Sequence, residues 1–180
     1  MSAGAISLAE ENFRTMLADS AKFRTLVGAT AGTEAQKHAA ALARIYREGL
    51  PPPTDKKEYT RTELEALRPC AIVFADEMDH ITLERDSSDG FAAAGSLTMM
   101  LFRTCPADQV LGNDRPSAAA DQEWSDIVGV VQYELATLSN TAGYLSFHRI
   151  RAGTFNVPSG DVPAQGVWQG ALYRIQWRGV

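Results

Sequence analysis

The chain has 180 residues, enough to bury an independent core, and its 45% hydrophobic and 22% charged residues are ordinary for a soluble globular protein. No apolar run approaches the roughly 18 residues of a membrane-spanning helix, so we expect no membrane association. The first residues, MSAGAISLAEENF, lack a basic stretch followed by an apolar one, so we expect no signal peptide and synthesis in a cytoplasm.

The net charge of -5 is unevenly distributed. Residues 1–66 carry nine Lys or Arg and nine Asp or Glu, whereas residues 67–180 carry eight against thirteen. Such a deficit argues against a general phosphate-binding surface. Six of the acids share one stretch with a single arginine: Asp76, Glu77, Asp79, Glu84, Asp86 and Asp89. A local basic patch stays open, since four arginines crowd the last two predicted strands: Arg149, Arg151, Arg174 and Arg178.

The N-terminal part carries helical signals. Two capping boxes, Ser7-Leu-Ala-Glu10 and Thr33-Glu-Ala-Gln36, each predict a helix start, because the hydroxyl accepts from the backbone and the fourth side chain reaches back. The second helix is predicted to include Ile45 and Tyr46 and to end at Gly49, before three prolines. We therefore divide the chain into an N-terminal helical segment (1–50), a Pro-rich connector (51–60) and an α+β domain (61–180).

The remaining chain is rich in predicted strands. Apolar runs and alternating patterns predict strands over residues 70–75, 80–85, 95–105, 144–150 and 168–177. A helix with one apolar stripe is predicted over residues 118–139. The order indicates an α+β fold, a mostly antiparallel sheet of about five strands with one amphipathic helix packed across it. The Gly- and Pro-rich residues 151–166 are predicted to form a long loop, functional or ordered by a partner.

The last strand alternates between two kinds of side chain. Tyr173 and Trp177 fall on one side and are predicted to be core residues, whereas Trp168 falls on the other and is predicted to anchor an interface. We expect this terminal strand to be where one subunit meets another, because an open sheet edge with a terminal strand can be extended by an adjacent chain.

No catalytic constellation is predicted. His38, His80 and His148 are dispersed, and no serine lies in a G-x-S-x-G sequence. The glycine-rich GATAG at 28–32 lacks the lysine of a phosphate loop. Cys70 and Cys105 sit in or beside apolar runs and are predicted to be buried thiols. We therefore expect no enzyme activity, catalytic residue, cofactor or metal.

The stretch Asp76-Glu-Met-Asp-His80 leaves one chemical alternative. Its carboxylates and imidazole are possible ligands of a divalent cation, although the spacing matches no established motif and a solvated turn explains it as well. A small metal-dependent hydrolase that uses this cluster is therefore an alternative. A cellular binding module that presents loop 151–166 to a peptide or small ligand is another.

Residues 67–180 combine several features in one order. LRPCAIVFADEMDHITLERD holds a short apolar strand preceded by Arg-Pro, a polar strand and an acidic turn. A GSLTMMLFR strand, an apolar-striped helix that begins near DQEW and the terminal VWQGALYRIQWRG follow. In this order of three strands, a helix and two strands, the chain resembles the tail terminators of long-tailed bacteriophages.

The resemblance implies a virion structural protein, made in the host cytoplasm. It implies a hexameric ring that caps the tail tube at its head-proximal end and joins tail to head. The implied partners are further copies, the tail tube protein and the head-closure protein, while genomic DNA passes through without specific binding. The family has no catalytic residues to carry over. Other neck proteins, namely head-closure (stopper) and tail tube proteins, share parts of this architecture and remain alternatives.

A ring requires two different patches on each subunit that meet head to tail. The acidic stretch and the late arginines form a candidate complementary pair. The interface residues that we predict on this basis are Asp86, Asp89, Arg149, Arg151, Trp168, Arg174 and Arg178. We also expect an acidic inner wall, formed by the two aspartates, to repel passing DNA.

Overall fold

The computed structural model describes residues 2–53, 58–75, 82–85, 91–112, 114–139, 146–156 and 167–179. Its first elements are helices α1 (Ser2–Asp19), α2 (Ala21–Leu26) and α3 (Glu34–Leu42), strand β1 (Ile45–Arg47) and helix α4 (Arg61–Leu67). Strands β2 (Cys70–Ala75), β3 (Thr82–Arg85) and β4 (Phe91–Thr104) follow, then a 3₁₀ turn (Ala107–Gln109) and the short hairpin β5 (Val110–Leu111) and β6 (Arg115–Pro116). Helix α5 (Ala118–Leu138) precedes strands β7 (Ser146–Asn156) and β8 (Trp168–Gly179).

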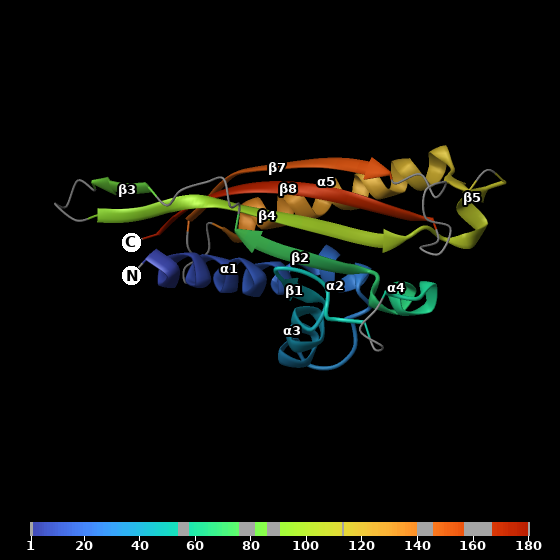
Figure 1. Cartoon of the computed structure of the whole chain (residues 1–180), viewed down its shortest axis with the longest axis horizontal. Coiled ribbons are helices and arrows are strands. Elements are labelled where there is room, and N and C mark those ends of the chain that lie inside the picture. Colours follow the sequence, from blue (N-terminus) through green and yellow to red (C-terminus); the bar gives the residue numbers. More distant parts are fainter. Residues whose placement is uncertain are drawn as a thin grey trace.

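One sheet forms the centre of the molecule (Figure 1). Its strands lie in the order β1, β2, β4, β8, β7, and β3 pairs with the first part of β4. Strand β1 runs parallel to β2, whereas the other pairs in this sheet are antiparallel. The predicted α+β fold with a mostly antiparallel sheet is therefore confirmed.

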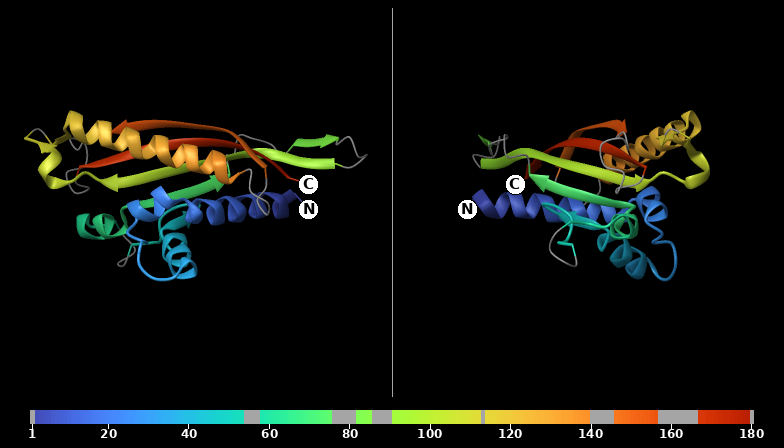
Figure 2. Two further views of the ribbon diagram at one scale, coloured as in Figure 1. Left: turned by 180° about the vertical axis from the view of Figure 1, so that it is seen from behind. Right: turned by 45° about the vertical axis from the view of Figure 1, so that its right-hand side comes forward.

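Two helices pack on the same face of the sheet, which Figure 2 shows from behind. Helix α5 contacts β7, while α1 contacts β2, β4 and β8. Side chains of α1, α2, α3 and α5 share one hydrophobic core with the strands, so the N-terminal segment packs on the same core as the sheet. The large, almost fully buried side chains of this core include Phe13, Met16, Leu17, Phe23, Leu97, Met99, Leu101, Trp124, Leu135, Tyr173 and Ile175.

Helix α5 confirms the apolar stripe that the sequence predicted. It begins after Ser117, whose hydroxyl accepts from the backbone N–H of Ala120 at 3.2 Å. Trp124 donates from Nε1 to the carbonyl of Gly170 at 3.0 Å, and the Tyr173 hydroxyl donates to the carbonyl of Val128 at 3.0 Å. These bonds satisfy the polar atoms of two buried aromatic residues, and they fix the position of α5 on the sheet.

The predicted end of the alanine-rich helix is wrong. The Thr33 capping box is present, but the helix ends at Leu42 and residues 45–47 form strand β1. Ile45 lies opposite Ala71 of β2 in the parallel register, and it is buried. A β-branched side chain packs well on a pleated sheet, so tertiary pairing overrides the helical pattern here.

The predicted capping box at Ser7 is also wrong, because α1 begins at Ser2 and Ser7 lies inside it. Its partner Glu10 is buried, with 3% of its surface exposed. The Glu10 carboxylate accepts from Arg47 Nε at 2.8 Å and from the backbone N–H of Ala75 at 3.0 Å. Glu10 therefore ties α1 to β1 and β2, where the charge is paired and hydrogen-bonded as burial requires.

Two strands are longer than predicted. Strand β7 continues to Asn156, so the predicted loop 151–166 begins as strand, held by pairing with β8. Strand β4 begins at Phe91, and its first residues pair with β3 beyond the end of β2. We call β3 together with residues 91–96 the arm, which projects to the left in Figure 1; residues 93–96 also pair with the end of β8.

Candidate functional site

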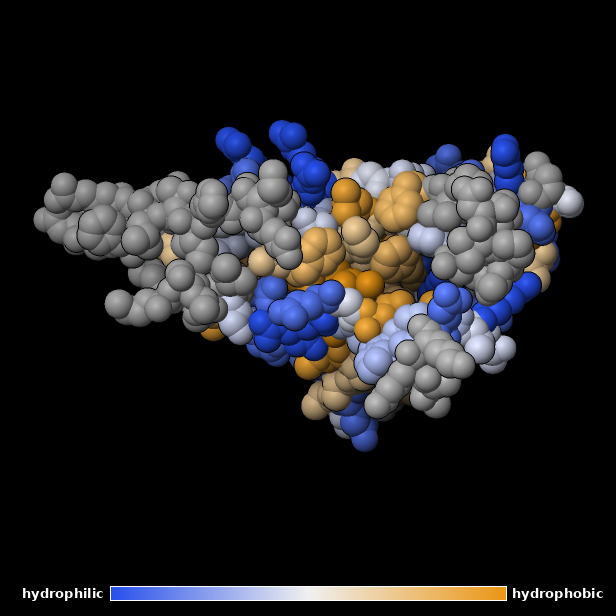
Figure 3. All heavy atoms as spheres, in the orientation of Figure 1, coloured by the Kyte–Doolittle hydropathy of each residue, from blue (hydrophilic) through white to orange (hydrophobic). Residues whose placement is uncertain are grey.

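Helices α1 and α5 pack on one face of the sheet, and on the second face Arg68, at the end of α4, lies over Trp168. The strand registers place seven half-buried apolar side chains there, and Figure 3 views this apolar surface directly. We call this the open face, the opposite one the covered face, and the seven side chains the apolar patch. They are Ile72, Phe74, Met100, Phe102, Phe155, Trp168 and Leu172.

Three rings form the densest part of the apolar patch. The centroids of Phe102 and Trp168 are 5.4 Å apart, those of Phe155 and Trp168 are 6.1 Å apart, and all three pairs meet edge to face. Phe155 lies directly over Gly170, where a Cβ atom would come within 2.4 Å of the ring. The Arg68 guanidinium covers the Trp168 ring at 5.0 Å. The strand backbone is therefore shaped to hold this aromatic cluster.

Two arginines lie beside the patch on the same face. Arg151 and Arg174 are directly opposite each other in the register of β7 and β8, and both are exposed. Neither guanidinium has an ion pair or hydrogen bond with a residue that the structure describes. The sequences of β2, β4, β7 and β8 contain no Asp or Glu. Like charges directly opposite each other destabilise a sheet, so this pair suits an anionic partner.

The free edge of the sheet at β7 is interrupted. Arg149 has a positive φ of 53°, and the register with β8 shifts between His148 and Arg151. Such a bulge leaves a residue unpaired and discourages another strand from adding to the edge. The terminal strand β8 lies inside the sheet, between β4 and β7. The expectation that an adjacent chain extends the sheet at the terminal strand is therefore wrong, and only the open face of β8 is accessible.

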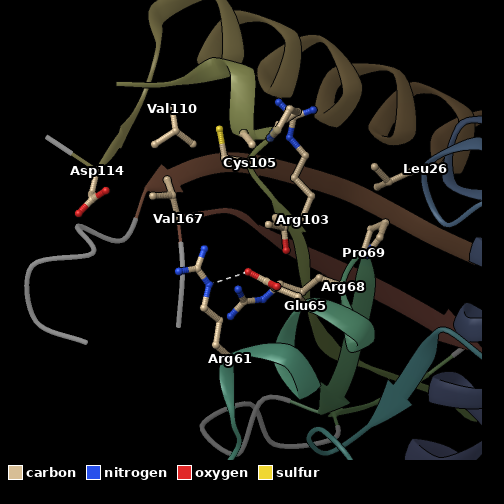
Figure 4. Close-up of a pocket in the computed structure, with 13 residues that line it drawn as sticks. Leu26, Arg61, Glu65, Arg68, Pro69, Arg103, Cys105, Val110, Asp114 and Val167 are labelled. Carbon is tan, nitrogen blue, oxygen red and sulfur yellow. Dashed lines mark hydrogen bonds and ion pairs between the residues drawn. The ribbon is translucent and has the colours of Figure 1, made fainter. Parts of the chain in front are cut away.

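A cavity of about 760 Å³ lies where α4, the end of β4 and the β5–β6 hairpin meet (Figure 4). Its wall includes Arg61, Arg68 and Arg103, but Arg61 is paired with Glu65 at 2.8 Å and Arg68 stacks on Trp168. Burial lowers the pKa of Arg68 and raises the pKa of the Cys105 thiol, which also lines the cavity. Arg61 and Arg68 on the cavity wall therefore make contacts within the fold.

Arg103 is a buried arginine to which sequence reasoning assigned no role. Its Nε donates to Gln169 Oε1 at 2.8 Å, its Nη2 donates to the carbonyl of Ala120 at 3.0 Å, and its guanidinium lies 5.2 Å from the Trp124 ring centroid. The alternation of side chains along β4 predicts that Arg103 is buried, because it shares a face with the buried Leu101. The residue joins β4, β8 and α5.

The predicted interface residues fall into two groups. Trp168, Arg151, Arg174 and Arg178 lie on the open face of β7 and β8, and Arg149 occupies the bulge. Asp86 and Asp89 lie outside the described residues, as does the cluster from Asp76 to His80. Tyr173 and Trp177 are buried on the covered face, which confirms their predicted place in the core.

Other predicted chemistry concerns thiols, histidines and metal ligands. Cys70 and Cys105 are free and buried as predicted, and burial raises the pKa of Cys70 to about 11. His38 Nδ1 lies 2.7 Å from Asp19 Oδ1, between two helices of the N-terminal segment. Within the described ranges, no three His, Cys, Asp or Glu side chains are grouped as metal ligands. No helix in the same ranges is long and apolar enough to cross a membrane.

No family model matches the chain. No curated protein is significantly similar to it. What the chain does must therefore be inferred from its fold and its surface.

Proposed function

We propose that the chain is a structural protein of the neck of a long-tailed bacteriophage, a tail terminator that forms a ring on the tail tube. The observation that carries the proposal is the order β2, β3, β4, α5, β7, β8. These strands form a sheet with α5 on one face and the apolar patch on the other. The resemblance to tail terminators rests on this order of elements.

The surface of the sheet supports a role in assembly. When a partner covers the exposed part of half-buried apolar side chains, association is favoured by about 25 cal/mol for each Å² of apolar area removed from water. The apolar patch includes three aromatic residues, which are enriched at protein interfaces. In this role the chain works through shape and association rather than catalysis.

The role has consequences for the virion. The ring stops growth of the tube at its head-proximal end and offers its other side to the head-closure protein. The chain is then a virion component, and genomic DNA passes through the ring without specific binding.

Deletion of the gene from the phage that encodes the chain tests the proposal. We expect filled heads and separate tail tubes of uncontrolled length, because nothing ends tube growth or joins the tube to the head. Negative-stain electron microscopy of the lysate measures both. Expression of the chain in trans should restore tails of uniform length.

Other outcomes distinguish the alternatives. A head-closure protein would leave tails of normal length beside heads that have lost DNA, and a tube protein would leave no tubes. Normal, infectious particles without the chain would contradict any role in the neck.

A further inference from the structure

We infer that the open face binds an acidic amphipathic helix of another protein. The apolar side of that helix lies on the apolar patch, and its carboxylates pair with Arg151 and Arg174. The inference goes beyond the proposed role in the neck and does not rest on it, because a cellular binding module would use the same surface in the same way. It specifies the chemistry of the partner that completes the sheet.

The receiving surface changes character along the strands. On β8 the apolar side chains of Trp168 and Leu172 come first, and Arg174 follows on the same face. Arg151 lies opposite Arg174 on β7, and both are exposed. Six residue steps along β8 separate Trp168 from Arg174, which is about 20 Å at 3.3 Å per residue. The open face therefore has an apolar end and a basic end.

The apolar patch is the part of this surface that a helix would bury. Its side chains are half-buried within the subunit, so part of each residue is still exposed, and Figure 3 shows apolar surface on this side of the molecule. Each Å² of apolar area that a partner removes from water favours binding by about 25 cal/mol. The patch therefore supplies affinity for any apolar partner surface, and charge selects among such partners.

The arginine pair selects an acidic partner. Neither Arg151 nor Arg174 has an ion pair or hydrogen bond with a described residue, and β2, β4, β7 and β8 contain no Asp or Glu. Like charges directly opposite each other in a sheet repel, and a carboxylate placed between them relieves that repulsion. The same face of a second copy cannot supply this carboxylate, because it carries the same four strands. The partner therefore contributes its acids from a surface of a different kind.

The form of the partner follows from the β7 edge and from the covered face. The bulge at Arg149 interrupts the edge of the sheet at β7, so addition of a strand there is disfavoured. Helices commonly cover the faces of a sheet, as α5 does on the covered face. A helix that spans ~20 Å has about 13 residues at 1.5 Å per residue. We therefore expect a helix of this length with an apolar stripe and acids toward one end.

The aromatic cluster argues against nucleic acid as the partner. Single-stranded nucleic acid binds where its bases stack on the flat faces of aromatic rings. Here Phe102, Phe155 and Trp168 meet edge to face, and the Arg68 guanidinium lies over the Trp168 ring at 5.0 Å. The net charge of -5 also repels a polyanion. A short acidic helix carries far fewer charges and needs no stacking surface.

A pair of peptides with opposite charge tests the inference. The probe is a fluorescein-labelled helical peptide with a stripe of Leu and Trp and with glutamates at one end, and its counterpart has lysines in place of the glutamates. Both orders of apolar and charged ends are used, because a helix can lie in either direction along the strands.

The charge of the face should decide which peptide binds. We expect the wild type to bind the acidic peptide at least ~10-fold more tightly than the basic one. The double variant Arg151→Glu with Arg174→Glu should prefer the basic peptide, because the sign of its face is reversed. Fluorescence anisotropy measures the affinities, and circular dichroism checks folding.

Matched controls separate the open face from general effects. Arg115→Glu, on β6 in the separate two-stranded sheet, should leave the affinity for the acidic peptide unchanged. Met100→Gln in the apolar patch should weaken binding several-fold, whereas Tyr133→Gln, at a 73% exposed position on α5, should not.

Three results would overturn the inference: equal affinity for the two peptides, a double variant that still prefers the acidic peptide, or tighter binding of a single-stranded oligo-dT than of the acidic peptide. If Met100→Gln lowers stability but leaves binding unchanged, the patch belongs to the interior of the subunit and the inference fails. Self-association of the wild type that the double variant abolishes would show that a second copy is the partner, which also refutes it. Failure of the peptides to bind leaves the proposed function standing, and normal tails without the chain refute that function whatever the peptides do.

Discussion

Met99 and Met100 are neighbours in β4, yet they belong to two different surfaces. Met99 points to the covered face and is fully buried between the strands and the helices, whereas Met100 points to the open face and is half-buried. The covered face is completed by the chain's own helices. The open face carries large apolar side chains that are only half-buried, which is typical of a surface that a partner completes.

The two faces also differ in whether their charged side chains have hydrogen-bonding partners. On the covered face, Arg103 bonds to Gln169 and Glu10 bonds to Arg47, so each buried charged group has a partner. On the open face, Arg151 and Arg174 have none within the described part of the chain. Charges on the covered face therefore stabilise the subunit, whereas Arg151 and Arg174 on the open face are exposed.

The largest expected effect comes from truncating each methionine in turn. Met99→Ala should lower the free energy of unfolding by about 3 kcal/mol, because it opens a cavity in a packed core. Met100→Ala should cost less than about 1.5 kcal/mol, because its site is partly solvated already. Urea denaturation followed by circular dichroism measures both. Equal losses would mean that the open face is packed within the subunit.

A second comparison uses two adjacent glutamates of α1. Glu10→Ala should cost about 2–3 kcal/mol, because it removes a buried carboxylate and leaves the Ala75 N–H without its acceptor. Glu11→Ala removes a carboxylate that is 52% exposed, paired with Arg14, and should cost under about 1 kcal/mol. Similar values for the two variants would contradict the structural role of Glu10.

The aromatic cluster gives a third comparison, confined to the open face. Gly170→Ala should destabilise by about 1–3 kcal/mol, because the new Cβ meets the Phe155 ring. Phe155→Ala in the same chain should remove most of that penalty, since the space is then free. A double-mutant cycle measured by denaturation gives the coupling energy. Additive effects would show that Phe155 does not rest on Gly170.

The smallest effect concerns thiol chemistry rather than stability. Burial raises the pKa of Cys70 from 9.0 to about 11, so at pH 8 its thiolate fraction is about 100-fold below that of the unfolded chain. Cys70 should react with iodoacetamide at least that much more slowly in the native protein. Cys105, on the cavity wall, should react first. Peptide mapping by mass spectrometry checks the order, and rapid alkylation of Cys70 would mean that the start of β2 is exposed.

The sequence alone determined the parts of the fold with strong local patterns. The stripe of α5 recurs at helical spacing over many residues, and Ala171, Tyr173, Ile175 and Trp177 alternate along the last strand. Both patterns arise from the local geometry of the element, so they predict which side is buried. Arg174 could be located on the last strand in the same way, whereas Arg151 fell in the predicted loop 151–166.

Only the tertiary structure decided what covers each face. The pattern of residues 33–49 is helical, but pairing with β2 turns Ile45–Arg47 into a strand. Glu10 resembled a helix cap, and its burial depends on β1 and β2, which lie far away in the sequence. The terminal strand was expected at an edge and lies inside the sheet. Strand order and helix placement depend on contacts between residues that are distant in the sequence. The periodicity of a local segment does not predict such contacts.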